Sequence, residues 1–425
     1  MKQNPGTPAA NTGHPLRSLR EPNVRIFFGG IVMSNAGTWA QLTVLILLVR
    51  QLGGEGLELG IIAATQFLPL LVLGLYAGAI ADRIDRHKRT IQLQAAMGVQ
   101  ALILGVIDWL DFETLPLLYA LNLGFGMLTA FDNPTRRTLV TELVPPEQLN
   151  NVLSLSTSVM TGSRIFGPAI GALLATSFGT HWAFLLNGLT YLVFLAAMMR
   201  LDTTRFHHLE KSPRSATPVR DGLREVWADP VLRVTVIVFA LIATFAFNNS
   251  VGFPLIITER LMEDDELFGF MVSVMSIGNV AGALFVARLV VVSQRMMYVG
   301  ASALALSLGA FSFSTSTAVA LVLVVPLGFT LTLFLNSANM IIQQRTSAAI
   351  RSRVMALIGV IFLGSTPIGG PITGIIGDTF GALWANLYGA LIAATSALLG
   401  LVAVRAISGS FNPPETTSGT DAPTA

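Results

Sequence analysis

Long apolar runs separated by short polar turns fill most of this chain of 425 residues. A helix that crosses a bilayer needs about 20 apolar residues. Twelve runs reach that length, and they are continuous rather than alternating, which favours helices over a β-barrel. The sequence therefore predicts an all-α membrane protein with twelve transmembrane helices. The predicted spans are residues 26–49, 59–81, 90–110, 114–132, 152–176, 180–199, 232–257, 267–290, 296–314, 317–340, 354–377 and 382–404.

The composition agrees with this pattern. Charged residues make up 12% of the chain and hydrophobic residues 52%, and the mean hydropathy is +0.66. A soluble chain carries about 25% charged residues, so most of this surface is expected to face lipid. The chain has no cysteine, which excludes disulfides, thiolate metal sites and cysteine nucleophiles.

Both ends of the chain are polar. Residues 1–23 lack the short apolar core and the small-residue cleavage site of a signal peptide. They are therefore expected to remain as a cytoplasmic N-terminal tail. Residues 407–425 are rich in Ser, Thr and Pro and are expected to form a disordered C-terminal tail.

Basic residues are distributed unequally between the two predicted sides of the membrane. All but three of the 26 Lys and Arg residues fall on the side of the termini. Arg50 and Arg260 fall on the other side, and Arg164 lies inside a span. Because basic loops stay in the cytoplasm, both termini are predicted to be cytoplasmic. The net charge of +2 reflects this topology, and we expect no nucleic acid partner.

The two halves of the chain repeat each other at an offset of about 203 residues. Gly167-Pro168-x-x-Gly171 matches Gly370-Pro371-x-x-Gly374, and Asn133 matches Asn336. This predicts two six-helix repeats related by an axis along the membrane normal. The expected organisation is an N-terminal bundle at 24–200, a cytoplasmic linker at 201–230 and a C-terminal bundle at 231–406.

Glycines four apart also recur on predicted helices 2, 5, 8 and 11, for example Gly278 and Gly282. Small residues at this spacing let a second helix approach closely. We predict that these helices slide against one another where the halves meet. Ordinary packing inside each half is the alternative.

A single charged turn joins the second and third spans. It contains Gly78, Asp82, Arg83 and Arg86. These residues match the G-x-x-x-D-R-x-G-R-R/K turn of the major facilitator superfamily of transporters, which the whole chain from 24 to 405 resembles. Asp85 stands where that pattern has Gly.

The fifth predicted helix carries a second match to the superfamily, whose antiporter pattern ends G-P-x-x-G-G. Gly167, Pro168 and Gly171 match it, while Ala172 replaces the last Gly. The stretch 132–137 and the DR-x-DR form of the charged turn are similar to the branch that contains the enterobactin exporter and macrolide-efflux proteins. This resemblance implies export of a siderophore, drug or antibiotic by alternating access, with protons as the coupling ion, by a monomer without a cofactor.

The resemblance also implies a gating role for the charged turn. In the superfamily such a turn locks the outward-facing state. Asp82 would lie near the start of helix 11, and the basic residues would lie near the helix-4 carboxylate, Asp132. The alternative is a solvated anchor that only sets topology.

Arg164 is a basic residue in the middle of a predicted span, where a charge costs about 2.5–3.5 kcal/mol. It shares a helix face with Gly167, Pro168 and Gly171 by its spacing. It is predicted either to contact an anionic or polar group of the substrate or to join a gating network. The alternative is that it donates to carbonyls freed by Pro168.

Polar residues at membrane depth are the candidates for a substrate cavity. The superfamily lines its cavity with helices 1, 4, 7 and 10, and interhelical hydrogen bonding is the alternative role for any one residue. The candidates are Asn35, Trp39, Asn248, Asn249, Asn336 and Asn339.

No enzyme motif or metal-ligand pattern is visible in the sequence, so we expect no enzyme and no metal. We also expect no carboxylate clearly inside a span, which leaves proton coupling to the resemblance. Two other functions remain open. The chain could move lysophospholipids or nutrients, or it could be a membrane sensor that transports nothing.

Overall fold

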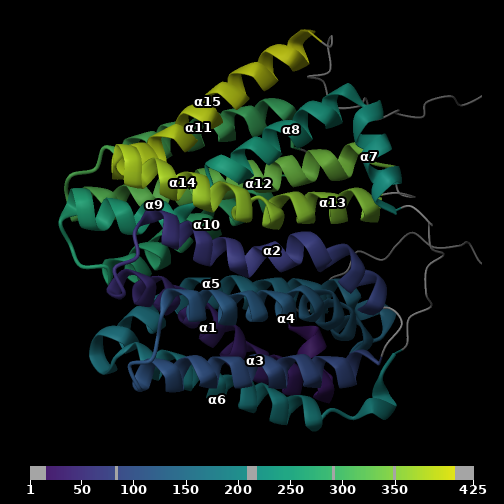
Figure 1. Cartoon of the computed structure of the whole chain (residues 1–425). Coiled ribbons are helices and arrows are strands. Elements are labelled where there is room, and N and C mark those ends of the chain that lie inside the picture. The colour runs from purple at the N-terminus through teal and green to yellow at the C-terminus, as the bar shows by residue number, and fades with distance from the viewer. Residues whose placement is uncertain (1–15, 82–84, 208–217, 290–291, 348–350, 407–425) are drawn as a thin grey trace, which may run out of the picture.

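The computed structural model describes residues 16–81, 85–207, 218–289, 292–347 and 351–406. These residues are helical wherever they form regular structure (Figure 1). Nine of the described helices are long and apolar enough to cross a membrane, or ten if the sharply bent pair α7–α8 is one span. The chain is therefore an all-helical, multi-pass membrane protein.

The helices fall into two groups. The first group comprises α1 (Pro22–Gln51), α2 (Gly56–Ala81), α3 (Arg86–Trp109), α4 (Leu115–Glu142), α5 (Leu149–Phe178) and α6 (Thr180–Met199). The second group comprises α8 (Pro230–Phe245), α9 (Asn249–Ile256), α10 (Leu267–Ala287), α11 (Gln294–Ser312), α12 (Thr317–Arg345), α13 (Arg351–Gly364), α14 (Thr366–Phe380) and α15 (Ala382–Ala406). The short helix α7 (Pro218–Ala228) precedes the second group.

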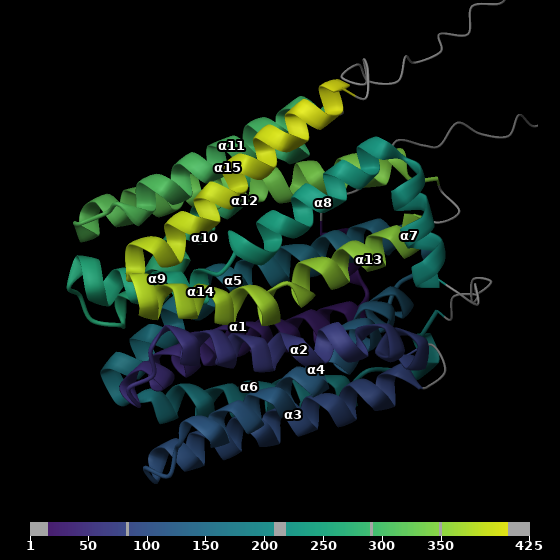
Figure 2. The same cartoon turned by 45° about the horizontal axis from the view of Figure 1, so that its top comes forward.

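Each group packs mainly on itself. In the first group α1 packs on α5 and α6, α2 on α4, and α3 on α6. In the second group α10 packs on α12, and α11 packs on α12 and α15. The groups meet where α2 lies against α14 and α13 and where α5 lies against α10. Figures 1 and 2 show the first group in purple and blue beside the second in green and yellow.

Local sequence explains where several helices begin and end. The Asp85 carboxylate accepts a hydrogen bond from the Lys88 amide at 3.0 Å and caps α3. The residue that departs from the superfamily pattern thus starts a helix. Gly179 and Gly381 end α5 and α14 with φ of 99° and 88°, values that favour glycine. The Phe-Gly pair repeated in both halves is therefore a helix stop.

One predicted span is broken in the structure, and another is interrupted by a single turn residue. The span expected at 232–257 consists of α8, a break at 246–248, α9 and a π-helical turn, Ile257–Leu261. The span expected at 354–377 consists of α13 and α14, which meet at Ser365. The Ser365 hydroxyl donates to the carbonyl oxygen of Ala243 at 3.1 Å, so this turn residue packs against the end of α8.

Two other predicted spans, 152–176 and 296–314, coincide with α5 and α11, which are not among the helices that pass the length and hydropathy criteria. The fourth predicted span is too short. Its helix, α4, continues beyond residue 132 to Glu142, which changes the position of Asp132 as described below.

Candidate functional site

Side chains join the two groups of helices at one end of the bundle, beyond the end of α1. The guanidinium of Arg50 contacts both carboxylate oxygens of Asp265, at 3.2 and 3.3 Å. It also donates to the Thr258 hydroxyl and to the Gly54 carbonyl oxygen, each at 3.1 Å. We call this end, which carries Arg50, Asp265 and Asp378, the closed end. The opposite end, which carries α7 and the charged turn, is the linker end.

A carboxylate from the second group caps a helix of the first group at the closed end. Asp378, near the end of α14, accepts hydrogen bonds from the backbone amides of Gly56 and Leu57 at 2.7 and 2.8 Å. These amides open α2 and have no partner within their own helix. An anion at a helix N-terminus contributes about 0.3–1 kcal/mol at an exposed site, so the cap stabilises contact between the groups.

Glycines allow α2 and α14 to touch at this end. A Cβ atom on Gly60 would lie 2.6 Å from the carbonyl oxygen of Gly370, and one on Gly56 would lie 2.7 Å from that of Gly374. Gly370 and Gly374 belong to the repeated Gly-Pro pattern found in the sequence. Their role here is close backbone contact between the groups.

The predicted sliding contacts of the other glycines are wrong for two helices. Gly278 and Gly282 of α10 face backbone atoms of α12 in their own group. Gly167 and Gly171 of α5 face α1, also in their own group. The reason is that these glycines allow two helices of the same bundle to pack closely, which is the alternative of ordinary packing inside each half. The contact between α5 and α10 is made instead by Gly269, which faces Pro168 and Ala172.

Burial changes the ionisation of Asp265, which lies outside the helices that could span a membrane. Burial raises the pKa of its carboxyl above the ordinary value of 3.8, and the neighbouring Arg50 partly offsets this effect. The ion pair with Arg50 is therefore costly to desolvate. Such pairs serve better to select one conformation than to add net stability.

At the linker end the structure describes part of the predicted gating motif. Gly78 lies in the last turn of α2, and Asp82 and Arg83 lie outside the described residues. Arg86, the first residue of α3, forms an ion pair with Glu142 at the end of α4. The helix-4 carboxylate next to Arg86 is thus Glu142 and not Asp132.

Asp132 lies inside α4 and is 2% exposed, so its predicted position at a helix end is wrong because α4 continues to Glu142. Its carboxylate accepts from the Gln94 amide at 2.8 Å and pairs with Arg136 at 3.3 Å. Asp132 therefore lies inside a helix that is long and apolar enough to cross a membrane. Arg136 in turn donates to Asn35 at 3.2 Å, which links α4 to α1.

Arg164 lies midway along α5, where the groups meet. Its guanidinium carbon is 4.8 Å from the centroid of the Trp39 ring of α1. The side chain is exposed in the structure, although it lies deep among protein atoms. Ser276 of α10 reaches the Arg164 carbonyl oxygen at 3.5 Å, so the second group approaches at the same level.

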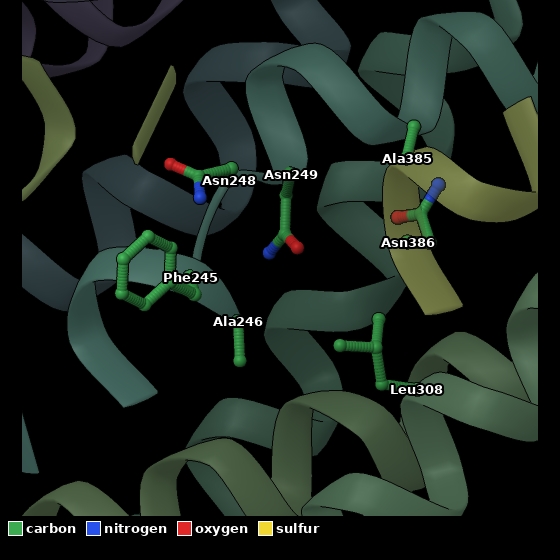
Figure 3. A pocket seen from close by; sticks show the side chains of 7 residues that line it. All are labelled: Phe245, Ala246, Asn248, Asn249, Leu308, Ala385 and Asn386. Carbon is green, nitrogen blue, oxygen red and sulfur yellow. The ribbon is translucent and has the colours of Figure 1, made fainter. Parts of the chain in front are cut away.

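The remaining cavity candidates do not form one site. Asn336 and Asn339 are half-buried on α12, and the Asn339 amide donates to the Leu335 carbonyl of its own helix at 2.9 Å. Asn248 and Asn249 lie at the break between α8 and α9. Their side chains face a cavity of about 10 Å³ together with Asn386 and Leu308 (Figure 3). That is room for about one water molecule, so this cavity does not accommodate a drug-sized compound.

The sequence analysis did not identify four residues that make contacts between helices: Arg50, Asp265, Asp378 and Glu142. Only Arg50 had a usable signal, since it is one of two basic residues on its side of the membrane. No group of three or more possible metal ligands occurs among the described residues.

The fold and these contacts define the class of the protein. An all-helical membrane bundle of two helix groups, joined by a Gly-Pro helix pair and carrying a basic turn between its second and third spans, is a transporter of the major facilitator class and not an enzyme. The chain belongs to the transmembrane secretion effector family, whose pattern matches residues 13–418.

Comparisons with individual proteins agree with the family. The chain is 28% identical over 412 residues to the multidrug efflux pump Tap of Mycolicibacterium fortuitum, covering 91% of this chain and 95% of the pump. It is 22% identical to the staphyloferrin A transporter of Staphylococcus aureus, covering 84% of this chain and 90% of that protein. The fold matches the inward-facing, occupied structure of a bacterial homologue of the lysosomal transporter Spinster with a TM-score of 0.73 at 13% identity, covering 95% and 100% of the two chains.

Proposed function

We propose that this protein exports a small amphipathic compound, a siderophore or a drug, by alternating access. The observation that carries the proposal is the difference between the closed end and the centre of the bundle. The groups are joined by Arg50–Asp265 and by Asp378 at the closed end, whereas Arg164 at the centre is accessible. Helix groups that are joined at one end, with an exposed polar side chain at the centre, are expected of one state of such a transporter.

The proposed topology has twelve spans, with both termini in the cytoplasm of a bacterium. It adds α5 and α11 to the helices that pass the hydropathy test and counts α7–α8 as one span. The many Ser and Thr residues of α5 and its Arg164 lower its mean hydropathy, which is expected of a helix that faces an interior path. An even number of spans also keeps nearly all basic residues on one side.

The proposed domains follow this topology. They are a bundle at 24–200, a cytoplasmic linker at 201–230 and a bundle at 231–406, with tails at 1–23 and 407–425. The closed end then faces outward, and the structure corresponds to an inward-facing state. A monomer is sufficient for this mechanism.

Gating and coupling are assigned to named residues. In the outward-facing state Gly78, Asp82, Arg83 and Arg86 are proposed to hold the linker end closed. Asp132 is the proposed proton carrier, because it is a buried carboxylate inside a helix and hydrogen-bonds with Gln94 and Arg136. Such groups at membrane depth serve as proton relays.

The substrate class and direction are supported by the relatives, which include an efflux pump, the staphyloferrin A transporter and a putative bacilysin exporter of Bacillus amyloliquefaciens. A deletion strain tests the proposal. We expect it to become more sensitive to amphipathic antibiotics or to secrete less siderophore, and wild-type protein to restore the phenotype. The variant Asp82→Asn should insert normally without restoring it. Unchanged sensitivity and secretion with an altered lipid profile would contradict export.

A further inference from the structure

Three arginines of the helix bundle have a carboxylate as counter-ion, whereas Arg164 has none among the described residues. Arg50 pairs with Asp265, Arg86 with Glu142, and Arg136 with Asp132. The guanidinium of Arg164 has neither an ion pair nor a hydrogen bond to any described residue, and its one close partner is the ring of Trp39. Because a lone charge at membrane depth is costly, the missing counter-ion needs an explanation.

The surroundings of Arg164 leave its hydrogen-bonding edge available. The indole of Trp39 lies against one face of the planar guanidinium, at 4.8 Å. Gly167, one turn further along α5, gives the Trp39 side chain this position, since a Cβ atom there would lie 2.5 Å from the Trp39 Cβ. A guanidinium stacked on a ring still presents N–H donors along its edge in a geometry that matches a carboxylate.

The position of the site also matters. Arg164 is accessible, and it lies on the face of α5 that meets α1 and α10. A ligand bound there would contact both groups of helices. On the same face of α5, one turn before Arg164, the side chain of Met160 is 49% exposed and offers an apolar surface. The arrangement suits a compound with one anionic group beside an apolar body.

We propose that Arg164 and Trp39 form the subsite that binds an oxyanion of the exported compound, and that the natural substrates carry a carboxylate next to an apolar or aromatic body. This proposal rests on the proposed function, because it assigns a substrate class to the same transporter. The bound carboxylate supplies a counter-ion that none of the described residues provides.

Binding to the purified protein in lipid nanodiscs tests the subsite with three probes that share one ring system. They are 1-naphthaleneacetate, its neutral amide, and 1-naphthylethylamine, which is cationic. The wild type is expected to prefer the carboxylate. Arg164→Gln should weaken carboxylate binding by about tenfold or more, as for a lost charge-assisted hydrogen bond, and should leave binding of the amide unchanged. Arg164→Lys should give an intermediate loss, because it keeps the charge without the planar fork.

Trp39→Leu should also weaken binding of the carboxylate, because it removes the ring that holds the guanidinium in place. Arg288→Gln is the matched control, since Arg288 is exposed at the end of α10. It should bind all three probes as the wild type does. If Arg164→Gln does not fold, as judged by its thermal unfolding, then the lysine variant decides the question.

The proposal is overturned if the wild type does not prefer the carboxylate to the amide, or if the Arg164 variants bind the carboxylate as tightly as the wild type. Transport of the same probes into proteoliposomes is measured separately. Preferential binding without transport would contradict the exporter function and leave the anion subsite standing. Transport of the amine with no preference for the carboxylate would support a transporter and overturn the subsite.

Discussion

Replacement of Gly60 by alanine is expected to open the closed end. The added Cβ would lie 2.6 Å from the Gly370 carbonyl oxygen and 2.6 Å from the Pro371 Cα. Ordinary contact begins at 3.4 Å, so α2 and α14 must separate by about 0.8 Å, the difference between these distances. Both obstructing atoms are backbone atoms, and no side chain can move aside to relieve the clash.

Overpacking of this kind costs about 1–3 kcal/mol. If the whole cost falls on the closed conformation, the ratio of closed to open molecules decreases by about 5- to 150-fold. The absence of cysteine in the chain makes the measurement direct. Spin labels can be attached at Glu55→Cys and Asp264→Cys, two exposed positions on different groups. Double electron–electron resonance then measures the distance between the labels across the closed end.

Gly74→Ala on the same helix is the matched control, because its Cβ would meet only the Leu70 side chain of its own helix, at 3.5 Å. It should give the parental distance distribution. The Gly60 variant should show a second, longer distance. An unchanged distribution in a folded Gly60→Ala protein would refute the idea that glycine contacts between α2 and α14 hold this end shut.

Four further outcomes are expected. Asp378→Asn should also lengthen the distance across the closed end, because it removes the charge that caps α2, whereas Asp82→Asn should shorten it. Arg50→Ala and Asp265→Ala should each open this end, because each single change leaves a partly buried charge unpaired. The double variant should open it less than the sum of the two single variants, with a coupling energy of about 1–2 kcal/mol. Additive effects would disprove the coupling. Arg86→Gln should destabilise the protein by about 2–3 kcal/mol in thermal unfolding, because it removes an ion-pair partner of the buried Glu142. Arg89→Gln at the same helix start should not. Burial raises the pKa of the Asp265 carboxyl, so its contribution to closure is full below the ordinary carboxyl pKa and declines as the pH rises through the raised pKa. The closed fraction should therefore fall as the pH is raised across this interval, and it should not do so in Asp265→Asn.

Much of the fold is readable from the sequence, because the bilayer imposes strong rules. Continuous apolar runs predicted the segments that form the nine or ten candidate spans of the described residues. The face shared by Arg164, Gly167 and Gly171 follows from helical spacing, and the structure places all three against α1.

The contacts between segments that lie far apart in the chain could not be predicted from the sequence. The mean hydropathy of α4 falls beyond residue 132, yet the helix continues to Glu142, because Arg86 and the α3–α4 packing cover its polar end. Arg50 and Asp265 are 215 residues apart, and no local pattern links them. The water-sized cavity at Asn248 and Asn249 arises from a helix break that the apolar run concealed.

Asp82 in the first half of the repeat and Asp378 in the second half have no acidic counterpart in the other half. At the repeat offset, Asp82 falls opposite Phe285, and Asp378 falls opposite Ala175. Asp378 ends α14 and caps the start of α2 at the closed end. In the proposed outward-facing state, Asp82 would face the start of helix 11 at the linker end, as the superfamily resemblance implies. Helices 2 and 11 would then cap each other at opposite ends, so that rocking which releases one cap allows the other to form. This exchange keeps the number of capped helix ends constant between the two states, and it would allow a modest coupling energy, such as that of a bound substrate or proton, to decide between them.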